Sequence, residues 1–263
     1  MPERTEYAHG TPSWVDLGTT DVAGAESFYS GIFGWEAERM PTGDGIYSMQ
    51  NVRGISAAGI YEQPEEQKTA GMQPTWTTYI SVDDVDATTA KVVPAGGTVM
   101  MEPFDVMDVG RMSVIGDPTG AAVALWQAKG GGRASLTGEH GAISWNELTS
   151  SDAAKSRTFL EEVLGVTNVA APGFGDYTMM SVDGTPVAGV VQRMEGMPEL
   201  PAPWLVYFAV DDCDAAFAKA TSTGGSVIVP PMDIPPGRFS ILKDPQGAAF
   251  AVMTVNPDYS PGG

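Results

Sequence analysis

The sequence repeats itself once, about 130 residues further along the chain. The string Ser-Trp-Val-Asp-Leu at 13–17 returns as Ser-Trp-Asn-Glu-Leu at 144–148. Later strings return in the same order, with small changes of spacing that indicate loops of different length. They are Tyr47-Ser48-Met49 with Tyr177-Thr178-Met179, Val82-Asp83-Asp84 with Val210-Asp211-Asp212, Gly110-Arg111 with Gly237-Arg238, and Asp117-Pro118-Thr119-Gly120 with Asp244-Pro245-Gln246-Gly247. Such a chain is expected to fold as two copies of one unit.

Each copy divides again into two sub-units, in which a strand is followed by a helix and then by further strands. In the first sub-unit, large and polar residues alternate over Trp14–Leu17 as they do in a strand. Asp21 is a candidate N-cap for a helix that runs through Phe28. Gly34 is expected to end this helix, because glycine readily adopts the left-handed conformation found at helix C-termini.

The second sub-unit begins with a β-rich run at Thr77–Val82, and Asp83 or Asp84 is expected to cap a helix that ends near Gly96 and Gly97. The short strands expected after it are Thr98–Met101, Met112–Ile115 and Ala121–Gln127. Four such βαβββ modules, with about eight strands in each half, predict an α+β fold with curved mixed sheets. The concave side of a curved sheet is a natural place for a small molecule.

The chain has 263 residues, which exceeds the size at which one core usually stops growing, so two domains are expected. We predict a first domain at 1–128 and a second at 140–263. Residues 129–139, which include the run Gly130-Gly131-Gly132, are predicted to form a flexible linker that packs poorly.

Charge and composition exclude several functions. Lys and Arg number 14 against 33 Asp and Glu, and the net charge of −19 would repel nucleic acids and anionic membranes. No apolar run is long enough for a membrane helix, and the start of the sequence lacks the apolar core of a signal peptide. The single cysteine, Cys213, is read as a structural thiol. A cytoplasmic monomer or homodimer is expected.

The ordered strings resemble the vicinal oxygen chelate superfamily, also called glyoxalase/bleomycin resistance/extradiol dioxygenase proteins. The residues that carry this resemblance are Val82–Asp86, Gly96-Gly97, Gly110-Arg111, Asp117–Gly120 and Leu125–Gln127, together with their second-half counterparts. The resemblance covers the chain from about Thr11 to Thr254. Within the superfamily the chain is similar to two-domain glyoxalase-like members from high-GC bacteria, some of which are described as glyoxalases and others as hydroxylases of aromatic polyketide pathways. The resemblance implies the predicted fold without settling the function.

Members of this superfamily usually hold a divalent metal with His, Gln or Glu side chains on the first and last strands of the modules. Indole, aliphatic and methyl side chains cannot bind a metal, and a threonine hydroxyl is a weak ligand. The corresponding positions of this chain are Trp14, Trp145, Thr77, Leu205, Ala124 and Ala251. We therefore expect no metal and no other cofactor.

Two carboxylates lie beside the repeated tryptophans. Asp16 and Glu147 follow Trp14 and Trp145 by two residues and so share their strand face. In an apolar wall either carboxylate would have a raised pKa and could act as a general acid or base. The alternative is a structural carboxylate that is hydrogen-bonded to a neighbouring strand or loop.

Aromatic residues also occupy the predicted ligand-facing positions. Tyr79 and Tyr207 share the face of Thr77 and Leu205, and Trp126 shares the face of Ala124. The sequence therefore predicts, together with Trp14 and Trp145, a pocket that stacks on a flat apolar molecule. Ordinary core packing is the alternative for any one of these side chains.

Two further repeated pairs are weaker candidates. His9 and His140 stand at matching positions ahead of the first strands and could be acid or base groups, or simply parts of a duplicated loop. Arg111 and Arg238 could bind a carboxylate or enolate oxygen of a ligand. Equally, each arginine could tie Asp-rich loops together.

Three functions are compatible with these patterns. The first is a metal-independent enzyme, of a hydroxylase type for example, that acts on a hydrophobic aromatic polyketide-like or quinone-like molecule in secondary metabolism. The second is a non-catalytic protein that binds a small molecule such as an antibiotic. The third is a glyoxalase-type lyase of methylglyoxal detoxification, which only the family resemblance favours. In each case the expected partner is a small molecule.

Overall fold

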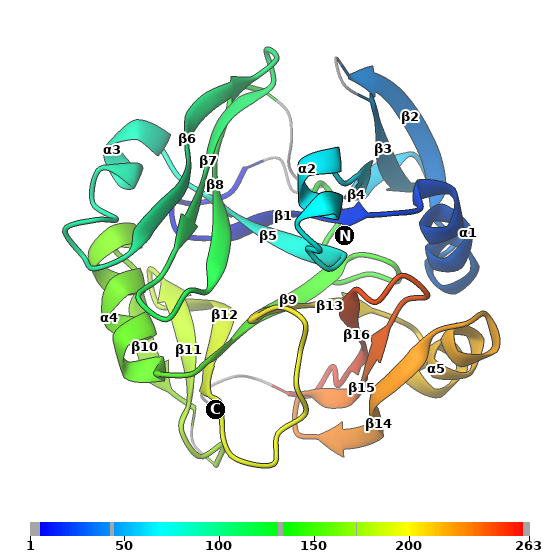
Figure 1. Cartoon of the computed structure of the whole chain (residues 1–263). Coiled ribbons are helices and arrows are strands. Elements are labelled where there is room, and N and C mark those ends of the chain that lie inside the picture. The colour runs from blue at the N-terminus through cyan, green and yellow to red at the C-terminus, as the bar shows by residue number, and fades with distance from the viewer. Residues whose placement is uncertain (1–5, 43–44, 131–133, 172, 260–263) are drawn as a thin grey trace.

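The computed structural model describes residues 6–42, 45–130, 134–171 and 173–259, and these form two eight-stranded mixed sheets, one in each half of the chain (Figure 1). The few helices are short, so the predicted α+β class with four βαβββ modules is confirmed. In chain order, the first half contains β1 (Pro12–Thr19), α1 (Val22–Phe33), β2 (Glu36–Thr42), β3 (Gly45–Val52), β4 (Ile55–Glu62), α2 (Glu65–Thr69), β5 (Thr75–Ser81), α3 (Val85–Thr89), β6 (Thr98–Val106), β7 (Gly110–Gly116) and β8 (Ala122–Ala128).

The second half repeats this order with one helix fewer. Its elements are β9 (Ile143–Ser150), α4 (Ala153–Leu164), β10 (Thr167–Ala170), β11 (Tyr177–Val182), β12 (Thr185–Gln192), β13 (Trp204–Ala209), α5 (Cys213–Ser222), β14 (Ser226–Ile234), β15 (Gly237–Lys243) and β16 (Ala249–Val255). The strand orders are β2-β3-β4-β1-β5-β8-β7-β6 and β10-β11-β12-β9-β13-β16-β15-β14. Two consecutive modules therefore build each sheet, joined at its centre by the antiparallel pair β1 and β5, or β9 and β13.

Local signals place the helix ends. The Asp21 side chain accepts a hydrogen bond from the backbone N–H of Gly24, and Gly34 ends α1 in the left-handed conformation, as the sequence predicts. In the second module the cap is Asp84, whose side chain accepts from Ala87 N–H. The helix α3 ends at Thr89, well before the predicted end near Gly96. A physical reason is Pro94, which disfavours helical geometry at the residue before it and has no N–H to donate.

Four helices lie between the two sheets, with α1 beside α5 and α3 beside α4, whereas α2 is exposed (Figure 1). One apolar core joins α1 and β1 of the first half to β13, α5 and β16 of the second. A second core joins β5 and α3 to α4 and β9. Aromatic rings dominate the first of these cores, where Phe33 packs against Phe208 with ring centres 4.9 Å apart. The two halves thus share their cores.

Buried polar contacts also join the halves. Each Asp-Pro-x-Gly turn folds around its aspartate, which accepts backbone N–H groups of its own turn and a hydroxyl from the other half. Asp117 accepts from Ser156 on α4, and Asp244 accepts from Tyr29 on α1 at 3.0 Å. Trp76 in turn donates its indole N–H to the Tyr29 hydroxyl. The turn motif that marks the repeat therefore also holds the two copies together.

The predicted linker differs in part from expectation. Gly131 to Arg133 lie outside the described residues, but the segment that follows them is packed. Ala134 and Leu136 are buried, and the Ala134 N–H donates to the carbonyl of Ser13 at 2.7 Å. This segment packs because Ala134 and Leu136 bury apolar side chains and because their backbone N–H groups donate to carbonyls of the first half.

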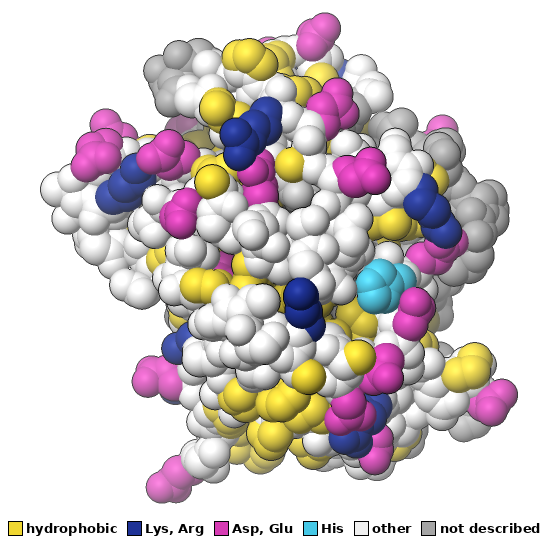
Figure 2. Space-filling model, turned by 90° about the vertical axis from the view of Figure 1, so that its right-hand side faces the viewer, with side chains coloured by type: hydrophobic (Ala, Val, Ile, Leu, Met, Phe, Trp, Pro, Cys, Tyr) yellow, Lys and Arg dark blue, Asp and Glu magenta, His cyan; other side chains and the backbone are white. Residues whose placement is uncertain are grey.

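The acidic residues are scattered over the surface and do not form one block. Figure 2 shows acidic side chains spread over one face of the molecule, several of them beside Lys or Arg. In the described part of the chain, no helix is long and apolar enough to cross a membrane.

Replacing Asp244 by alanine tests the contact between the halves. We expect Asp244→Ala to lower the free energy of unfolding by about 2–4 kcal/mol, because three backbone N–H groups and the buried Tyr29 hydroxyl lose their acceptor. Denaturant unfolding followed by circular dichroism measures this change. The control is Asp233→Ala, which removes an exposed partner of Arg238 and should have little effect. A loss no larger than that of the control would contradict the prediction.

Candidate functional site

Each sheet has one side packed against the other half and one distal face turned away from it. The alternation of β1 sends Val15 and Leu17 into the shared core and leaves Trp14 and Asp16 for the distal face. Figure 1 shows the outer strands of both sheets bending away from the other half, so each distal face is concave. The predicted ligand-facing residues Tyr79, Trp126 and Tyr207 lie on these two faces.

Asp16 is the main ionisable group of the first distal face. Its side chain is buried, with the residue only 3% exposed. The Tyr79 hydroxyl donates to Asp16 Oδ2 at 2.8 Å, and the Tyr47 hydroxyl lies 3.4 Å from the same oxygen. The other oxygen, Asp16 Oδ1, is buried without a hydrogen-bond partner in the described structure. One oxygen of the carboxylate is therefore held by hydrogen bonds, and the other is buried and unpaired.

Burial determines the protonation of this group. Desolvation raises the pKa of Asp16 from 3.8 to about 7, against the opposing effect of the hydrogen bonds from Tyr79 and Tyr47. Burial also raises the pKa of both tyrosines well above 10, and the nearby Asp16 charge raises it further. The phenols are therefore neutral donors at neutral pH, while the carboxyl group is close to half-ionised.

Tyr47 is a site residue that the sequence reading missed. It comes from β3, and its hydroxyl accepts a hydrogen bond from the Trp14 indole N–H at 2.9 Å. Gly59 on β4 makes room for it, because a Cβ at this position would overlap the Tyr47 hydroxyl. The signal was the repetition of Tyr47 as Tyr177, which reveals a common role but not the contact with Trp14.

The second distal face keeps this arrangement around Glu147. The Tyr207 hydroxyl donates to Glu147 Oε1 at 3.3 Å, and the Trp145 indole donates to the Tyr177 hydroxyl at 2.8 Å. Burial raises the pKa of Glu147, and hydrogen bonds from Tyr177 and Tyr207 oppose the rise. Trp145 and Glu147 are only half-buried. The second face is thus a more open version of the first.

The outer parts of the two faces differ. Tyr61 stands opposite Tyr47 in the first sheet, and Val191 stands opposite Tyr177 in the second. Two residues after the matching alanines Ala124 and Ala251, the first half has Trp126 and the second has Met253. The halves therefore share the acid and its immediate partners but not the surrounding wall.

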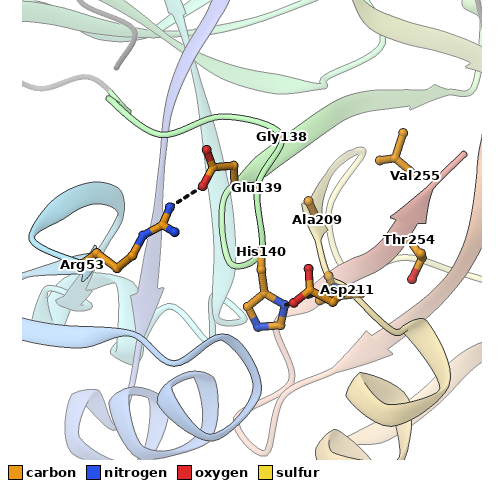
Figure 3. Close-up of a pocket in the computed structure, with 9 residues that line it drawn as sticks. Arg53, Gly138, Glu139, His140, Ala209, Asp211, Thr254 and Val255 are labelled. Atoms are coloured by element: carbon orange, nitrogen blue, oxygen red, sulfur yellow. Dashed lines mark hydrogen bonds and ion pairs between the residues drawn. The ribbon is translucent and has the colours of Figure 1, made fainter. Parts of the chain in front are cut away.

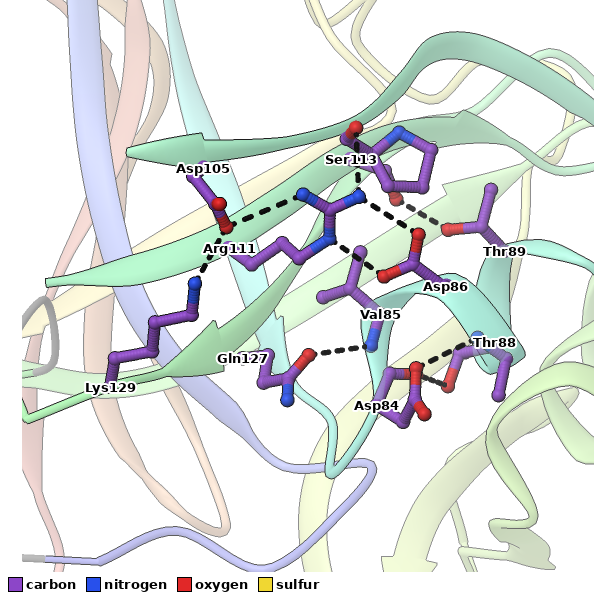
Figure 4. A network of polar contacts seen from close by, with 12 residues as sticks. Asp84, Val85, Asp86, Thr88, Thr89, Asp105, Arg111, Ser113, Gln127 and Lys129 are labelled. Atoms are coloured by element: carbon purple, nitrogen blue, oxygen red, sulfur yellow. Dashed lines mark hydrogen bonds and ion pairs between the residues drawn. The ribbon is translucent and has the colours of Figure 1, made fainter. Parts of the chain in front are cut away.

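The two arginines are bound elsewhere. Arg111 forms a two-pronged contact with Asp86 of α3 and also contacts Asp105 of β6 (Figure 4). Arg238 contacts Asp214 and Asp233 in the same way. Each guanidinium ties a helix to the edge of its sheet, which is the alternative role that the sequence left open. Their predicted role in binding a ligand stays a prediction.

The two histidines occupy matching positions just ahead of β1 and β9. His9 Nδ1 accepts from the backbone N–H of Asp83, and His140 Nδ1 accepts from that of Asp211, both at 3.1 Å. His140 lines a surface cleft of about 520 Å³ together with Arg53, which pairs with Glu139 (Figure 3). This cleft is lined by neither Asp16 nor Glu147. We therefore place the candidate chemistry on the first distal face, where a buried oxygen of Asp16 lacks a partner in the described structure.

The residues of the distal faces do not fit a divalent metal. Over the described ranges, no three His, Cys, Asp or Glu side chains gather where they could hold a metal ion. On the first face the oxygens hydrogen-bonded to Asp16 belong to the phenols Tyr47 and Tyr79, which stay protonated at neutral pH and are therefore poor ligands. Trp14, Thr77 and Ala124 occupy the positions at which the resemblance implies metal ligands. We derive no step through a metal.

The sequence profile of the Glyoxalase/Bleomycin resistance protein/Dioxygenase superfamily matches residues 11–125 and again 142–252. The chain belongs to this superfamily. Both matches coincide with one eight-stranded sheet each, so the duplication read from the sequence is a duplication of the superfamily unit.

Relatives within the superfamily cover almost the whole chain. CFP32 of Mycobacterium tuberculosis, which bears a provisional glyoxylase name, is 48% identical over 98% of this chain and 99% of its own. The anthracycline biosynthesis protein DnrV of Streptomyces peucetius is 38% identical over 97% of both chains. Among solved structures, the Mn(II)-bound glyoxalase from Novosphingobium aromaticivorans has a TM-score of 0.65 at 17% identity, with 94% of this chain and 82% of that chain covered. At this identity the likeness concerns the fold.

The raised pKa of Asp16 predicts a dependence of stability on pH. Because the folded pKa of about 7 exceeds 3.8, the folded form is favoured at low pH and loses stability as the pH rises from about 4 to 7. At about 1.4 kcal/mol per pKa unit, the loss is about 4 kcal/mol. Asp16→Asn, which cannot ionise, should therefore be more stable than the wild type at pH 8 and close to it at pH 4.

Denaturant unfolding of both proteins between pH 4 and 8 measures this difference. The control is Asp86→Asn, because the hydrogen bonds from Arg111 lower the pKa of Asp86, and its loss should not stabilise the protein at pH 8. A constant difference between Asp16→Asn and the wild type across this range would show that Asp16 does not titrate near neutrality.

Proposed function

We propose that this protein is a metal-independent enzyme that acts on a hydrophobic aromatic molecule, polyketide-like or quinone-like, in secondary metabolism. Asp16 is the proton acceptor in this proposal, and Trp14, Tyr79 and Trp126 belong to the wall against which the rings lie. The first distal face is the reaction site. Glu147 and the second distal face form a related site with a different wall.

One observation carries the proposal. Asp16 combines a fixed oxygen, held by Tyr79, with a buried oxygen that has no partner in the described structure. Buried polar atoms in proteins are nearly always paired, and exceptions gather at functional sites. A carboxyl group with a pKa near 7 is also suited to general base catalysis at neutral pH, because it is partly ionised and still basic enough to take a proton.

The chemistry that this arrangement supports is the removal of a weakly acidic proton. Asp16 Oδ1 would accept the proton of a ring hydroxyl, or of a C–H group made acidic by a neighbouring carbonyl. Tyr79 and Tyr47 hold the other oxygen and keep the carboxylate in place. In a hydroxylase-type reaction the resulting carbanion would react with dioxygen. One oxygen atom then becomes the carbonyl oxygen at the former CH₂ carbon, and the other leaves as water with the two hydrogens of that group.

Two further observations favour an aromatic substrate. The first distal face is built from Trp14, Tyr79 and Trp126, and large flat side chains of this kind stack well on fused rings. The relative DnrV is named for anthracycline biosynthesis, and anthracyclines are polycyclic aromatic compounds. The first observation concerns this chain directly, and the second supports the same class of molecule.

Turnover of anthrone by Asp16→Asn tests the role of Asp16. Anthrone has an acidic methylene between its rings. With dioxygen it gives anthraquinone and water, so that atoms balance without a further reductant. We expect the wild type to accelerate this reaction, and Asp16→Asn to lower kcat about 10²–10⁴-fold because the proton acceptor is lost. The formation of anthraquinone, followed by absorbance, measures both rates.

Glu147→Gln is the matched control from the second half and should leave most of this turnover intact. Equal rates for the wild type and Asp16→Asn would contradict the assignment of Asp16. Stoichiometric binding of anthrone without any product would instead support a sequestering protein, the second function compatible with the sequence.

Removal of metals tests whether the proposed enzyme is metal-independent. We expect dialysis against EDTA and 1,10-phenanthroline to leave the anthrone turnover unchanged, because the side chains around Asp16 do not fit a metal. The same dialysed protein should not convert the hemithioacetal of methylglyoxal and a thiol, the reaction that the provisional name of CFP32 suggests. Loss of anthrone turnover that Zn²⁺, Mn²⁺ or Fe²⁺ restores would overturn metal independence.

A further inference from the structure

Trp126 carries a second buried polar atom without a partner on the first distal face. The residue is 5% exposed, and its Nε1 has no hydrogen-bond partner among the described residues. An indole nitrogen can only donate, so the missing partner must be an acceptor. Trp and Tyr usually find a partner for their polar atom when they are buried. The site therefore offers one donor that its own residues do not use.

The position of Trp126 connects it to Asp16. Its ring meets the ring of Tyr79 edge-on, with the centres 6.2 Å apart and the planes at 81°. The hydroxyl of Tyr79 in turn donates to Asp16. Tyr79 therefore contacts both residues that carry a partnerless buried atom, Trp126 through its ring and Asp16 through its hydroxyl.

The position is also adapted to this ring. Gly110 on β7 faces Trp126, and a Cβ at Gly110 would overlap the six-membered part of the indole. The matching glycine of the second half, Gly237, faces the backbone of Thr254 instead. Met253 replaces the tryptophan there and offers no donor. The fold therefore does not require an indole at this strand position, and the donor belongs to the first half alone.

We propose that Trp126 determines specificity, with its Nε1–H donating to an oxygen acceptor of the ligand while Asp16 faces the acidic group. The ligand class is then an aromatic ketone or quinone, in which a carbonyl oxygen pairs with Trp126. This inference rests on the proposed function for the location of the ligand. It adds a polar contact that distinguishes carbonyl-bearing rings from hydrocarbons of the same shape.

The walls next to Trp126 can adjust to admit such a molecule. Met49 and Met112 are partly buried and pack against the cluster that contains Trp14, Tyr79 and Trp126. Methionine side chains are flexible and fill irregular spaces, so they can change rotamer when a ring enters.

A pair of matched ligands tests the inference. Fluorenone and fluorene share one ring frame, and only fluorenone has a carbonyl in place of the methylene. We expect the preference of the wild type for fluorenone over fluorene to fall about tenfold in Trp126→Phe, because the hydrogen bond is lost while an aromatic ring remains. Equilibrium dialysis of both ligands against both proteins measures this ratio, in which the difference in ligand hydrophobicity cancels.

Met253→Leu is the control from the second half and should keep the wild-type preference. Thermal unfolding checks that Trp126→Phe is folded. In the wild type, the indole N–H signal of Trp126 in ¹H–¹⁵N spectra should move clearly further downfield with fluorenone than with fluorene, because only fluorenone can accept its hydrogen bond. This measurement does not depend on the variant folding.

The outcomes separate the two proposals. If Trp126→Phe weakens both ligands equally, or if the indole signal responds equally to both, Trp126 only packs against the ligand and the inference fails. In that case the anthrone turnover and its loss in Asp16→Asn would still stand. If neither ligand binds the wild type, the inference fails as well, and an absence of anthrone turnover would then reject the proposed function separately.

Discussion

The packing of each half against the helices of the other is the constraint on which the rest of the structure depends. Because the apolar sides of both sheets are committed to shared cores, the alternation of β1 and β9 leaves Trp14 with Asp16, and Trp145 with Glu147, for the distal faces. The position of each carboxylate thus follows from its core-facing neighbours on the same strand, such as Leu17 beside Asp16 and Leu148 beside Glu147. The site inherits its rigidity from a core that neither half can complete alone.

The duplication separates what the acid needs from what surrounds it. Both halves keep an indole that donates to a tyrosine and a second tyrosine that donates to the carboxylate. Tyr61 and Trp126 have no such counterparts, since Val191 and Met253 stand in their places. The features kept in both halves hold the acid in place by hydrogen bonds, and the features found in one half make the two walls different.

The sequence predicts those parts of the molecule that depend on local or periodic signals. The repeat predicted the modules, Asp21 and Gly34 predicted the ends of α1, and the period of two predicted the face that Trp14 and Asp16 share. It did not predict that Tyr47 reaches Asp16, because that contact joins strands whose register depends on the whole sheet. Arg111 was ambiguous for the same reason, since its partner Asp86 belongs to another element.

The absence of metal-ligating side chains at the expected positions and the raised pKa of Asp16 have a common physical basis. A divalent cation beside a carboxylate stabilises the ionised form and would keep the pKa of Asp16 low. No Lys or Arg is among the groups that shift this pKa, and neutral phenols compensate only part of the cost of burial. An acid buried among aromatic rings, with no cation among the groups that shift its pKa, therefore has a pKa near neutrality. In the proposed function, the aromatic surroundings of Asp16 thus favour acid–base chemistry over metal chemistry.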